Sequence, residues 1–282
     1  MALKTVSTEQ AELIFFAGSE LLEGPVWDEK RQLIYCVSID DHIIYRLDPK
    51  TTEVTSYLTD GPVGAAVLNA DGQLLSAEKS GIYRINPDTK ARTFLTQPNQ
   101  DERLRYNDGK LDPKGRLLIG TMGEEDVIEG AASLFSVAAD GNGHKELLSG
   151  LSIANGLGWS ADGQVFYHID TPTNKVRQYA YDLEEGTLSN ERICVEVTGE
   201  GSPDGMCVGP DGTLWVAEFG GGKVCQWDPK TGDKLTEIAL PATNVTSCCI
   251  GGKSMDYLLV TTARDGEGKE PLSGGLFRIK IS

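Results

Sequence analysis

Residues 155–167 read NGLGWSADGQVFY, and this stretch holds the pattern from which the fold can be predicted. A short apolar segment leads into the turn Ala161-Asp162-Gly163, and β-branched and aromatic residues follow the turn. That arrangement is the usual signal of a β-hairpin. A polar residue, Asn155, stands eight positions before the turn glycine. The same spacing recurs in the pairs Asn107 and Gly115, Asp204 and Gly212, and Glu23 and Arg31.

This shared position recurs along the chain at residues 23, 64, 107, 155, 204 and 246, at intervals of 41, 43, 48, 49 and 42 residues. Trp27 and Trp159 each lie four residues after it, which supports the alignment of the units. Each unit continues into a second hairpin, such as residues 81–87, so that it holds four short strands. Intervals of this size are typical of propeller blades. The sequence therefore predicts an all-β, six-bladed β-propeller with four antiparallel strands per blade, as a single domain over residues 1–282.

The two ends of the chain are expected to close the ring. Residues 11–17 and residues 275–280 both have the composition of strands, and we expect them to pair in the last blade. No amphipathic helix of convincing length is found, and the connections are too short for the crossover helices of a doubly wound α/β fold.

Composition restricts the class of partner. The formal charge of −16 argues against nucleic acid and anionic membranes, both of which are bound through Lys and Arg. The first residues, MALKTVS, lack the apolar segment of a secretory signal, so we expect a cytoplasmic protein. The six cysteines form no Cys-x-x-Cys pair and are expected to be reduced and mostly buried. Small molecules and cations are the expected partners; the sequence makes no prediction of oligomeric state.

In a propeller, equivalent positions of the blades meet around one axis. Glu23, Asn155 and Asp204 would then bring two carboxylates and one amide oxygen to a single point, a set that suits one divalent cation. Calcium is the first expectation, magnesium or manganese are alternatives, and zinc is less typical because no histidine is included. The alternative is that Asn155-Gly156 and Asp204-Gly205 are ordinary turns. The repetition of polar residues at the shared position favours the metal site.

Two further groups of residues are candidates for substrate binding. Arg105 lies two residues before Asn107, so both side chains face the same side of an extended strand. The alternatives are a surface arginine paired with an acidic residue, and Asp108-Gly109 as a turn. Glu124 and Glu125 follow a predicted strand and begin an irregular segment, which is either a lid over the mouth of the channel or a solvated acidic loop.

The ordered set of motifs resembles the regucalcin (senescence-marker protein) and gluconolactonase family over nearly the whole chain. The matching segments are Glu23-Gly24-Pro25-Val26-Trp27, Arg105-Tyr106-Asn107-Asp108-Gly109-Lys110, Gly120-Thr121-Met122-Gly123-Glu124-Glu125, Asn155-Gly156-Leu157-Gly158-Trp159-Ser160, Pro203-Asp204-Gly205-Met206, residues 246–253 and Ala263-Arg264-Asp265-Gly266. One departure is Val37-Ser38-Ile39, where the family usually has Val-Asp-Ile.

The resemblance implies a six-bladed propeller that hydrolyses sugar lactones with one divalent metal ion in its central channel. By motif, it assigns the metal to Glu23, Asn155 and Asp204. It assigns sugar binding to Arg105 and Asn107, with Glu125 contacting the hydroxyls from the lid. The small-molecule partner is accordingly a sugar lactone.

The expected mechanism is polarisation of the lactone carbonyl by the metal and attack of a water molecule whose proton Asp204 accepts. The main rival is a calcium-binding regulatory protein without turnover, and Arg105 and Asn107 favour the enzyme because a calcium buffer does not need them. A repeat scaffold would leave the polar residues unexplained. Paraoxonase-like or luciferin-regenerating chemistry would require a more apolar mouth. The three histidines lie in no Ser-His-Asp arrangement and are expected to be structural.

Overall fold

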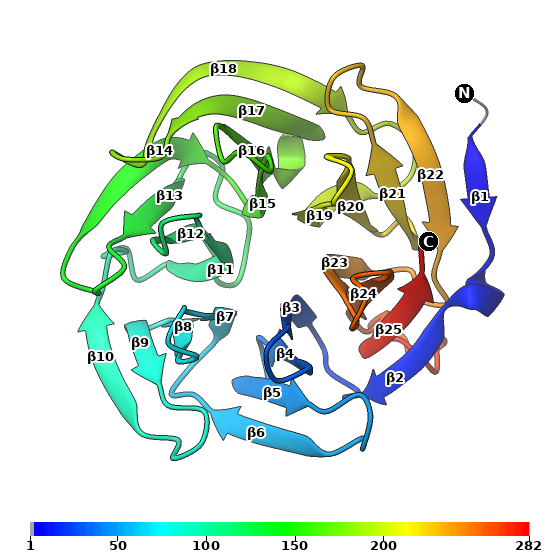
Figure 1. The fold of residues 1–282 in the computed structure, drawn as a ribbon, viewed down its shortest axis with the longest axis horizontal. Coiled ribbons are helices and arrows are strands. Elements are labelled where there is room, and N and C mark those ends of the chain that lie inside the picture. The colour runs from blue at the N-terminus through cyan, green and yellow to red at the C-terminus, as the bar shows by residue number, and fades with distance from the viewer. Residues whose placement is uncertain (1–2, 282) are drawn as a thin grey trace.

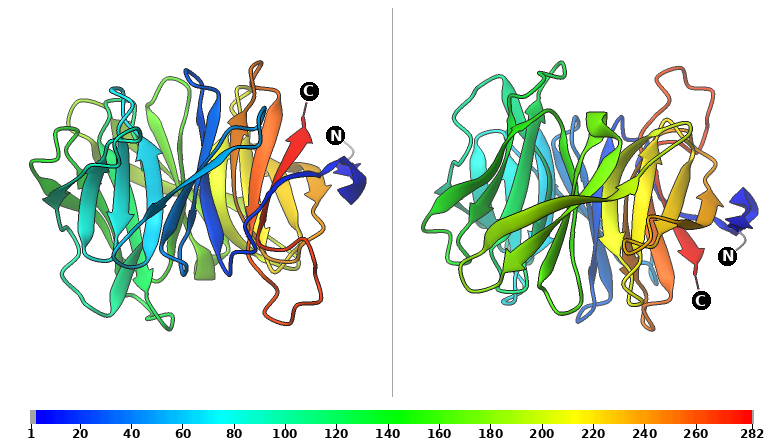
Figure 2. Two further views of the ribbon diagram at one scale, coloured as in Figure 1. Left: turned by 90° about the horizontal axis from the view of Figure 1, so that it is seen from below. Right: turned by 90° about the horizontal axis from the view of Figure 1, so that it is seen from above.

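Six sheets, each built on four antiparallel strands, are arranged as blades around a central axis in the computed structural model, which describes residues 3–281. Figure 1 views the ring down this axis, and Figure 2 shows the same blades from two sides. The predicted six-bladed, all-β propeller is confirmed. The first two residues and the last residue of the predicted domain lie outside the described residues.

The blades follow the chain in order, and in the first five blades the chain runs from the innermost strand outwards. The last blade takes its outermost strand from the N-terminal part of the chain. Blade 1 contains β3 (Leu22–Asp28), β4 (Leu33–Ser38), β5 (Ile43–Leu47) and β6 (Val54–Leu58). Blade 2 contains β7 (Val63–Leu68), β8 (Leu74–Glu78), β9 (Gly81–Ile85) and β10 (Arg92–Thr96). Blade 3 contains β11 (Leu104–Leu111), β12 (Leu117–Gly123), β13 (Ala132–Val137) and β14 (His144–Leu151).

The second half of the ring is built in the same way. Blade 4 contains β15 (Ala154–Trp159), β16 (Val165–Asp170), β17 (Lys175–Asp182) and β18 (Thr187–Glu196). Blade 5 contains β19 (Ser202–Val208), β20 (Leu214–Phe219), β21 (Lys223–Trp227) and β22 (Lys234–Ala239). Blade 6 contains β23 (Val245–Gly251), β24 (Tyr257–Thr262), β25 (Gly275–Lys280) and the N-terminal β2 (Glu12–Phe16). Two 3-10 turns, η1 (Thr8–Gln10) and η2 (Thr171–Thr173), are the helical elements among residues 3–281.

The ends of the chain close the ring as predicted. Strand β2 pairs antiparallel with β25, with Glu12 opposite Arg278, so the first and last parts of the chain share blade 6. A short additional strand, β1 (Lys4–Val6), pairs parallel with β22 and gives blade 5 a fifth strand that the sequence did not predict.

The hydrophobic core consists of six clusters, one at each interface between neighbouring blades. Between blades 5 and 6, for example, Trp215 and Ile238 pack against Leu258 and Phe277. The clusters are separate because each sheet is apolar on both faces and every face meets the next blade. All six cysteines are free, and five of them are buried, as expected from their strand contexts.

The turn glycines have the conformation that the hairpin pattern requires. Gly115, Gly163 and Gly212 have φ of 82°, 70° and 80°, where a Cβ atom would be strained. In blade 1 the equivalent turn is different, because Gln32 and not Arg31 has positive φ, at 58°. Among the described residues, no helix has the length and apolar character needed to cross a membrane.

Candidate functional site

The shared position of the six units is a β-bulge on the innermost strand of every blade. At each of these points the pairing between the first and second strands shifts by one residue, as between Asn155 and Leu157 in blade 4. The other five shifts lie between Glu23 and Val26, Val63 and Ala65, Tyr106 and Gly109, Pro203 and Met206, and Val245 and Ser247. A bulge interrupts the regular alternation of side chains and is often found beside active sites. Six bulges at one level therefore provide six positions from which side chains can leave the alternating pattern.

The turn interpretation of the Asn-Gly and Asp-Gly pairs is wrong. Asn155-Gly156 lies inside β15 and Asp204-Gly205 inside β19, and neither glycine has positive φ. A Cβ atom on Gly156 would lie 2.8 Å from the carbonyl oxygen of Asp204, and one on Gly205 would lie 2.7 Å from Cα of Ser247. These glycines are required because adjacent inner strands approach closely, and not because the chain turns.

Close approach also explains the one shared position without a side chain. Gly64 lies in β7, and a Cβ atom there would overlap the backbone carbonyl of Tyr106 on the neighbouring inner strand. Asp108-Gly109 likewise lies inside β11, where a Cβ on Gly109 would be 2.6 Å from Cδ1 of Ile119. The expectation that this pair forms a turn is wrong for the same reason.

A continuous chain of hydrogen bonds joins the polar residues of blades 3, 4 and 5. Arg105 donates from Nη1 to Oδ1 of Asn107 (2.8 Å), and Asn107 donates from Nδ2 to Oδ1 of Asn155 (3.1 Å). Asn155 donates from Nδ2 to Oγ1 of Thr171 (3.0 Å), and that hydroxyl donates to the carbonyl oxygen of Pro203 (2.8 Å). Thr171, in η2, was not predicted from the sequence, because it lies sixteen residues after Asn155 in an irregular connection.

Arg105 is buried, with 6% of its surface exposed, so the surface alternative for this residue is wrong. Burial lowers the pKa of its guanidinium, while the charges of Asp40, Glu23 and Asp204 act in the opposite direction. Arg105 therefore lies within electrostatic reach of both predicted metal-binding carboxylates.

Glu23 and Asp204 are buried acids without a cationic partner. Each is 7% exposed, and among residues 3–281 no Lys, Arg or His nitrogen lies within 4.0 Å of either carboxylate. The pKa of Glu23 is raised to about 8, first by burial and then by the charge of Asp108, and the N–H of Gly24 and the charge of Arg105 act in the opposite direction. Burial also raises the pKa of Asp204 well above its usual range, with the charges of Glu23 and Asp108 adding to the effect. Without a cation, the site disfavours the ionised form of both acids.

Asp108 is a third acid at this point that sequence reasoning treated only as a turn residue. It is 8% exposed, its Oδ2 has no hydrogen-bond partner within the described residues, and burial raises its pKa. Asn107 and Asp108 are the two residues left unpaired between Tyr106 and Gly109, so the bulge identifies Asp108 only once the strand pairing is known. Lys110, whose charge lowers the pKa of Asp108, donates from Nζ to the carbonyl oxygens of Leu157 (2.9 Å) and Met206 (2.6 Å).

The loop after β12 places Glu124 and Glu125 differently. Both are exposed, but Glu124 forms an ion pair with Lys79, and its charge acts on Arg105. The backbone N–H of Glu124 donates to the carbonyl oxygen of Arg103 (2.9 Å), which holds the start of the loop beside β11. Within residues 3–281 the side chain of Glu125 takes part in no hydrogen bond, whereas that of Glu124 accepts one from Lys79. Contact of Glu125 with a substrate thus stays a prediction.

The residues present fit a divalent cation with oxygen ligands. Glu23, Asp204 and Asn155 offer two carboxylates and one amide, and the orphaned Oδ2 of Asp108 is a further buried oxygen. Within the part of the chain that the structure describes, no group of three or more His, Cys, Asp or Glu side chains has the arrangement of a metal site, and the amide of Asn155 would have to complete the set. Hard oxygen donors of this kind suit Ca²⁺, Mg²⁺ or Mn²⁺.

The histidine in the core plays no part in this cluster. His168 lies on β16 and is buried, and neither ring nitrogen has a hydrogen-bond partner among residues 3–281. Burial lowers its pKa to about 3. Its ring stacks on Phe166 with 6.0 Å between centroids, which is the environment of a structural residue.

Fold and site together define a six-bladed propeller with buried oxygen donors gathered around its axis. The chain belongs to the family described as the SMP-30/Gluconolactonase/LRE-like region, whose model matches residues 21–264. It is 35% identical over 285 residues to regucalcin from Xenopus laevis, covering 97% of this chain and 95% of that protein. The family predicted from the sequence motifs is confirmed.

Solved structures agree with this assignment. A calcium-binding protein, regucalcin, from Agrobacterium tumefaciens superposes with a TM-score of 0.92 at 26% identity, over 99% of this chain and 95% of that one. A luciferin-regenerating enzyme superposes with a TM-score of 0.86 at 28% identity, over 96% and 95% of the two chains. The family thus includes proteins named for calcium binding and proteins named as enzymes.

Proposed function

We propose that the protein is a metal-dependent hydrolase that opens sugar lactones to the corresponding sugar acids. The observation that supports it best is the pair of buried, uncompensated carboxylates of Glu23 and Asp204 beside the hydrogen-bonded pair Arg105 and Asn107. The carboxylates suit a cation, and the guanidinium and amide offer the donors and acceptors that a polyhydroxylated ring requires. Membership of a family that includes gluconolactonases supports the same activity.

In this proposal Glu23, Asn155 and Asp204 hold one divalent cation, with calcium as the first candidate and zinc, magnesium or manganese as alternatives. When bound, such an ion supplies a Lewis acid for the lactone carbonyl. Arg105 and Asn107 orient the ring hydroxyls, and Glu125 contacts them from the loop after β12. Asp204, which is also a ligand, accepts the proton of the attacking water; coordination of the cation keeps its carboxylate ionised and lowers its basicity.

A second candidate is a calcium-binding regulatory protein without significant turnover. The names of the relatives favour it, since both the Xenopus protein and the Agrobacterium structure are called regucalcin, and the latter is described as calcium-binding. The acid pair alone would be sufficient for this role. The buried Arg105 would not be required, and its desolvation would oppose folding.

The proposal is tested by measuring hydrolysis of glucono-, galactono-, xylono- and arabinono-lactone, with the release of protons as the assay signal. The protein is first treated with a chelator and then supplied with Ca²⁺, Mg²⁺, Mn²⁺ or Zn²⁺. We expect metal-dependent turnover that Glu23→Ala and Asp204→Ala abolish and that the exposed control Glu53→Ala leaves unchanged. Metal binding without turnover on any lactone would support the regulatory candidate instead.

Asp204→Asn separates the two roles of this residue. The amide keeps an oxygen ligand but removes the base, so we expect a large fall in kcat with metal binding weakened but measurable by calorimetry. Full turnover with unchanged metal affinity would contradict the assignment of Asp204.

A further inference from the structure

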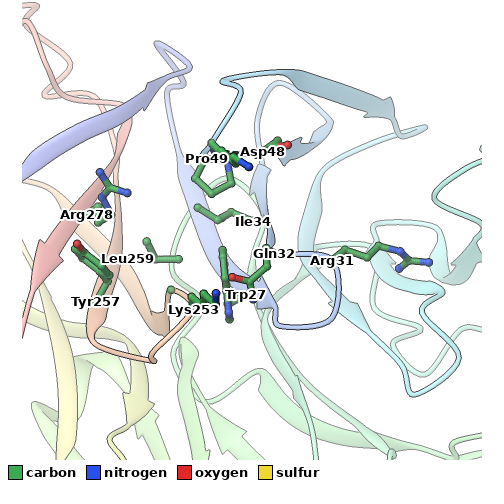
Figure 3. A pocket seen from close by; sticks show the side chains of 12 residues that line it. Trp27, Arg31, Gln32, Ile34, Asp48, Pro49, Lys253, Tyr257, Leu259 and Arg278 are labelled. Carbon is green, nitrogen blue, oxygen red and sulfur yellow. Dashed lines mark hydrogen bonds between the residues drawn. The ribbon is translucent and has the colours of Figure 1, made fainter.

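A pocket of about 800 Å³ lies between blades 6 and 1, at the end of the inner strands opposite the acid cluster. Trp27, near the end of β3, lines the pocket, whereas Glu23 lies near the start of the same strand. Figure 3 shows Ile34 and Pro49 of blade 1 on one side and Tyr257 and Leu259 of blade 6 on the other. The volume and the apolar walls are those of small-molecule sites.

The depth of the pocket follows from two glycines of blade 6. A Cβ atom on Gly251 would lie 3.3 Å from Cγ of Trp27 and 2.7 Å from Cδ1 of Leu259. One on Gly252 would lie 2.7 Å from the ring of Tyr257, and Gly252 has φ of 88°. The absence of side chains here leaves the indole and phenol rings exposed to one another across the groove.

Comparison with other blades shows why this groove is open. The third strands of blades 1, 2 and 6 share a pattern, IIYR at 43–46, GIYR at 81–84 and GLFR at 275–278. Arg46 donates to the carbonyl oxygen of Pro87 (3.2 Å) and Arg84 to that of Asp140 (3.2 Å), so each guanidinium bridges to the outer turn of the next blade. Blade 4 is held in a similar way, by Arg116 donating to the carbonyl oxygens of Leu183 (2.5 Å) and Glu184 (2.9 Å).

Arg278, the equivalent residue of blade 6, does not make this bridge. It donates from Nη2 (2.6 Å) and Nε (3.2 Å) to Glu12 on β2, and its guanidinium lies 5.0 Å from the ring centroid of Tyr257. Within residues 3–281 no hydrogen bond joins it to the outer turn of blade 1, where Pro49 lies. The carbonyl acceptor that the repeat supplies to Arg46 and Arg84 is therefore missing at Arg278, whose hydrogen bonds within residues 3–281 come from Nη2 and Nε alone.

The charge at the rim is opposite to that of the molecule. The pocket is lined by one carboxylate, Asp48, and by four cations, although the chain carries a net charge of −16. The cations are Arg31, Lys50, Lys253 and Arg278, of which Arg31 is paired with Asp28 and Arg278 with Glu12. Asp48 already accepts the backbone N–H groups of Lys50 (2.8 Å) and Thr51 (3.2 Å). No ion pair of Lys50 or Lys253 is found among the described residues, so both ammonium groups are available to a ligand.

We infer that the pocket between blades 6 and 1 binds a planar organic anion. Its flat apolar body lies between Trp27, Ile34 and Tyr257, and its carboxylate or phosphate takes the acceptor place at Arg278, with Lys253 beside it. This site is separate from the acid cluster, so occupancy does not depend on the divalent cation. The ligand class is set by charge and shape: a neutral ring would leave the ammonium groups of Lys50 and Lys253 without an anionic partner, and a small inorganic anion would leave the apolar walls exposed.

Titration calorimetry of the full chain in a chelator tests the inference with 2-naphthoate as the probe and 2-naphthamide as its neutral isostere. We expect one saturable site for the naphthoate and binding of the amide at least about tenfold weaker, because the charge-assisted hydrogen bonds are lost. Lys253→Glu and Arg278→Gln should each weaken naphthoate binding by about tenfold or more. Asp204→Asn should leave it unchanged, since that residue is not at this pocket.

Lys230→Glu is the matched control. Lys230 follows Asp228-Pro229 in the outer turn of blade 5, as Lys50 follows Asp48-Pro49 in blade 1, and both donate a backbone N–H to the preceding aspartate at 2.8 Å. Binding in this variant should match the unaltered protein. Because Arg278 also holds β2, its variant could fail to fold, and Lys253→Glu on an exposed loop then decides the result. No saturable binding, equal binding of the amide, or undiminished binding by Lys253→Glu would each overturn the inference.

Discussion

Replacement of the ionisable carboxyl of Glu23 by an amide should stabilise the metal-free protein, although the same change removes a proposed metal ligand. The carboxyl has an ordinary pKa of 4.5 and a pKa of about 8 in the folded chain, mainly because of burial. At about pH 7.5 the unfolded chain therefore releases a proton that the folded chain largely retains. With about 1.4 kcal/mol for each of the roughly three pH units between the ordinary pKa and pH 7.5, ionisation of Glu23 in the unfolded chain lowers the free energy of unfolding by about 4 kcal/mol.

The sign of the pH dependence follows from the raised pKa. The folded state binds the proton more tightly than the unfolded state, so the metal-free protein gains stability as the pH falls from about 8 towards 4.5. Glu23→Gln keeps the side-chain shape and has no charge to lose. We expect the variant to exceed the unaltered protein in free energy of unfolding by up to about 4 kcal/mol at pH 7.5 and by less than about 1 kcal/mol at pH 5.

Chemical denaturation with a chelator, followed by circular dichroism at both pH values, measures these differences. Excess Ca²⁺ should reverse the order at pH 7.5, because binding to the folded state stabilises the unaltered protein and not the variant. Glu53→Gln, at an exposed carboxylate, is the control and should change neither measurement. If Glu23→Gln destabilised the metal-free protein at pH 7.5, or gained as much from Ca²⁺ as the unaltered protein does, the reasoning would be refuted.

Three further predictions concern the substrate side, the inner strands and the closure of the ring. If the guanidinium of Arg105 orients the hydroxyls, Arg105→Ala should raise KM for a lactone with a smaller change in kcat. A fall in kcat alone would instead place Arg105 beside the developing charge. Steady-state kinetics distinguish the two results. Gly205→Ala should lower the free energy of unfolding by about 3 kcal/mol in denaturant titrations, because its Cβ would lie 2.1 Å from Oγ and 2.5 Å from Cβ of Ser247. The double variant with Ser247→Gly removes both of these atoms and should recover part of the loss. Deletion of residues 1–17 should abolish cooperative thermal unfolding, since β25 would lose its pairing with β2; an unaltered melting curve would show that closure is dispensable.

Local patterns in the sequence were sufficient to predict the fold because hairpins are encoded over short distances. The turn glycines, such as Gly163, and the β-branched residues after them determine each hairpin, and six copies at blade-sized intervals can form only a few architectures. The fifth strand β1 could not be predicted in this way, since it joins β22 through a contact between distant parts of the chain.

The site was predictable in position but not in geometry. Counting from the turns located Asn155 and Asp204, yet the bulges that turn these side chains out of the alternating pattern depend on close packing of neighbouring inner strands. Asp108 was missed because a bulge with two residues between paired positions resembles an Asp-Gly turn in the sequence. Thr171 was missed because it reaches the cluster from a connection outside the repeat.

The six shared positions are equivalent by symmetry, and packing determines which of them can carry functional side chains. Gly64 of blade 2 is restricted to glycine by the carbonyl of Tyr106. Thr246 of blade 6 uses its hydroxyl to donate to the carbonyl oxygen of Leu22 (2.6 Å), which ties blade 6 to blade 1, and to bond Thr261 (2.9 Å).

Polar side chains not used in this way are left in blades 1, 3, 4 and 5. Blades 1 and 5 supply the carboxylates of Glu23 and Asp204, blade 3 supplies Asn107 next to the cationic Arg105, and Asn155 of blade 4 bonds to Asn107. The ring thus has an acidic part and a part rich in hydrogen-bond donors around one axis. That asymmetry suits the proposed hydrolase, which would hold a cation and a neutral, polyhydroxylated substrate side by side. A ring with six equal ligands would enclose the ion and leave no place for the substrate.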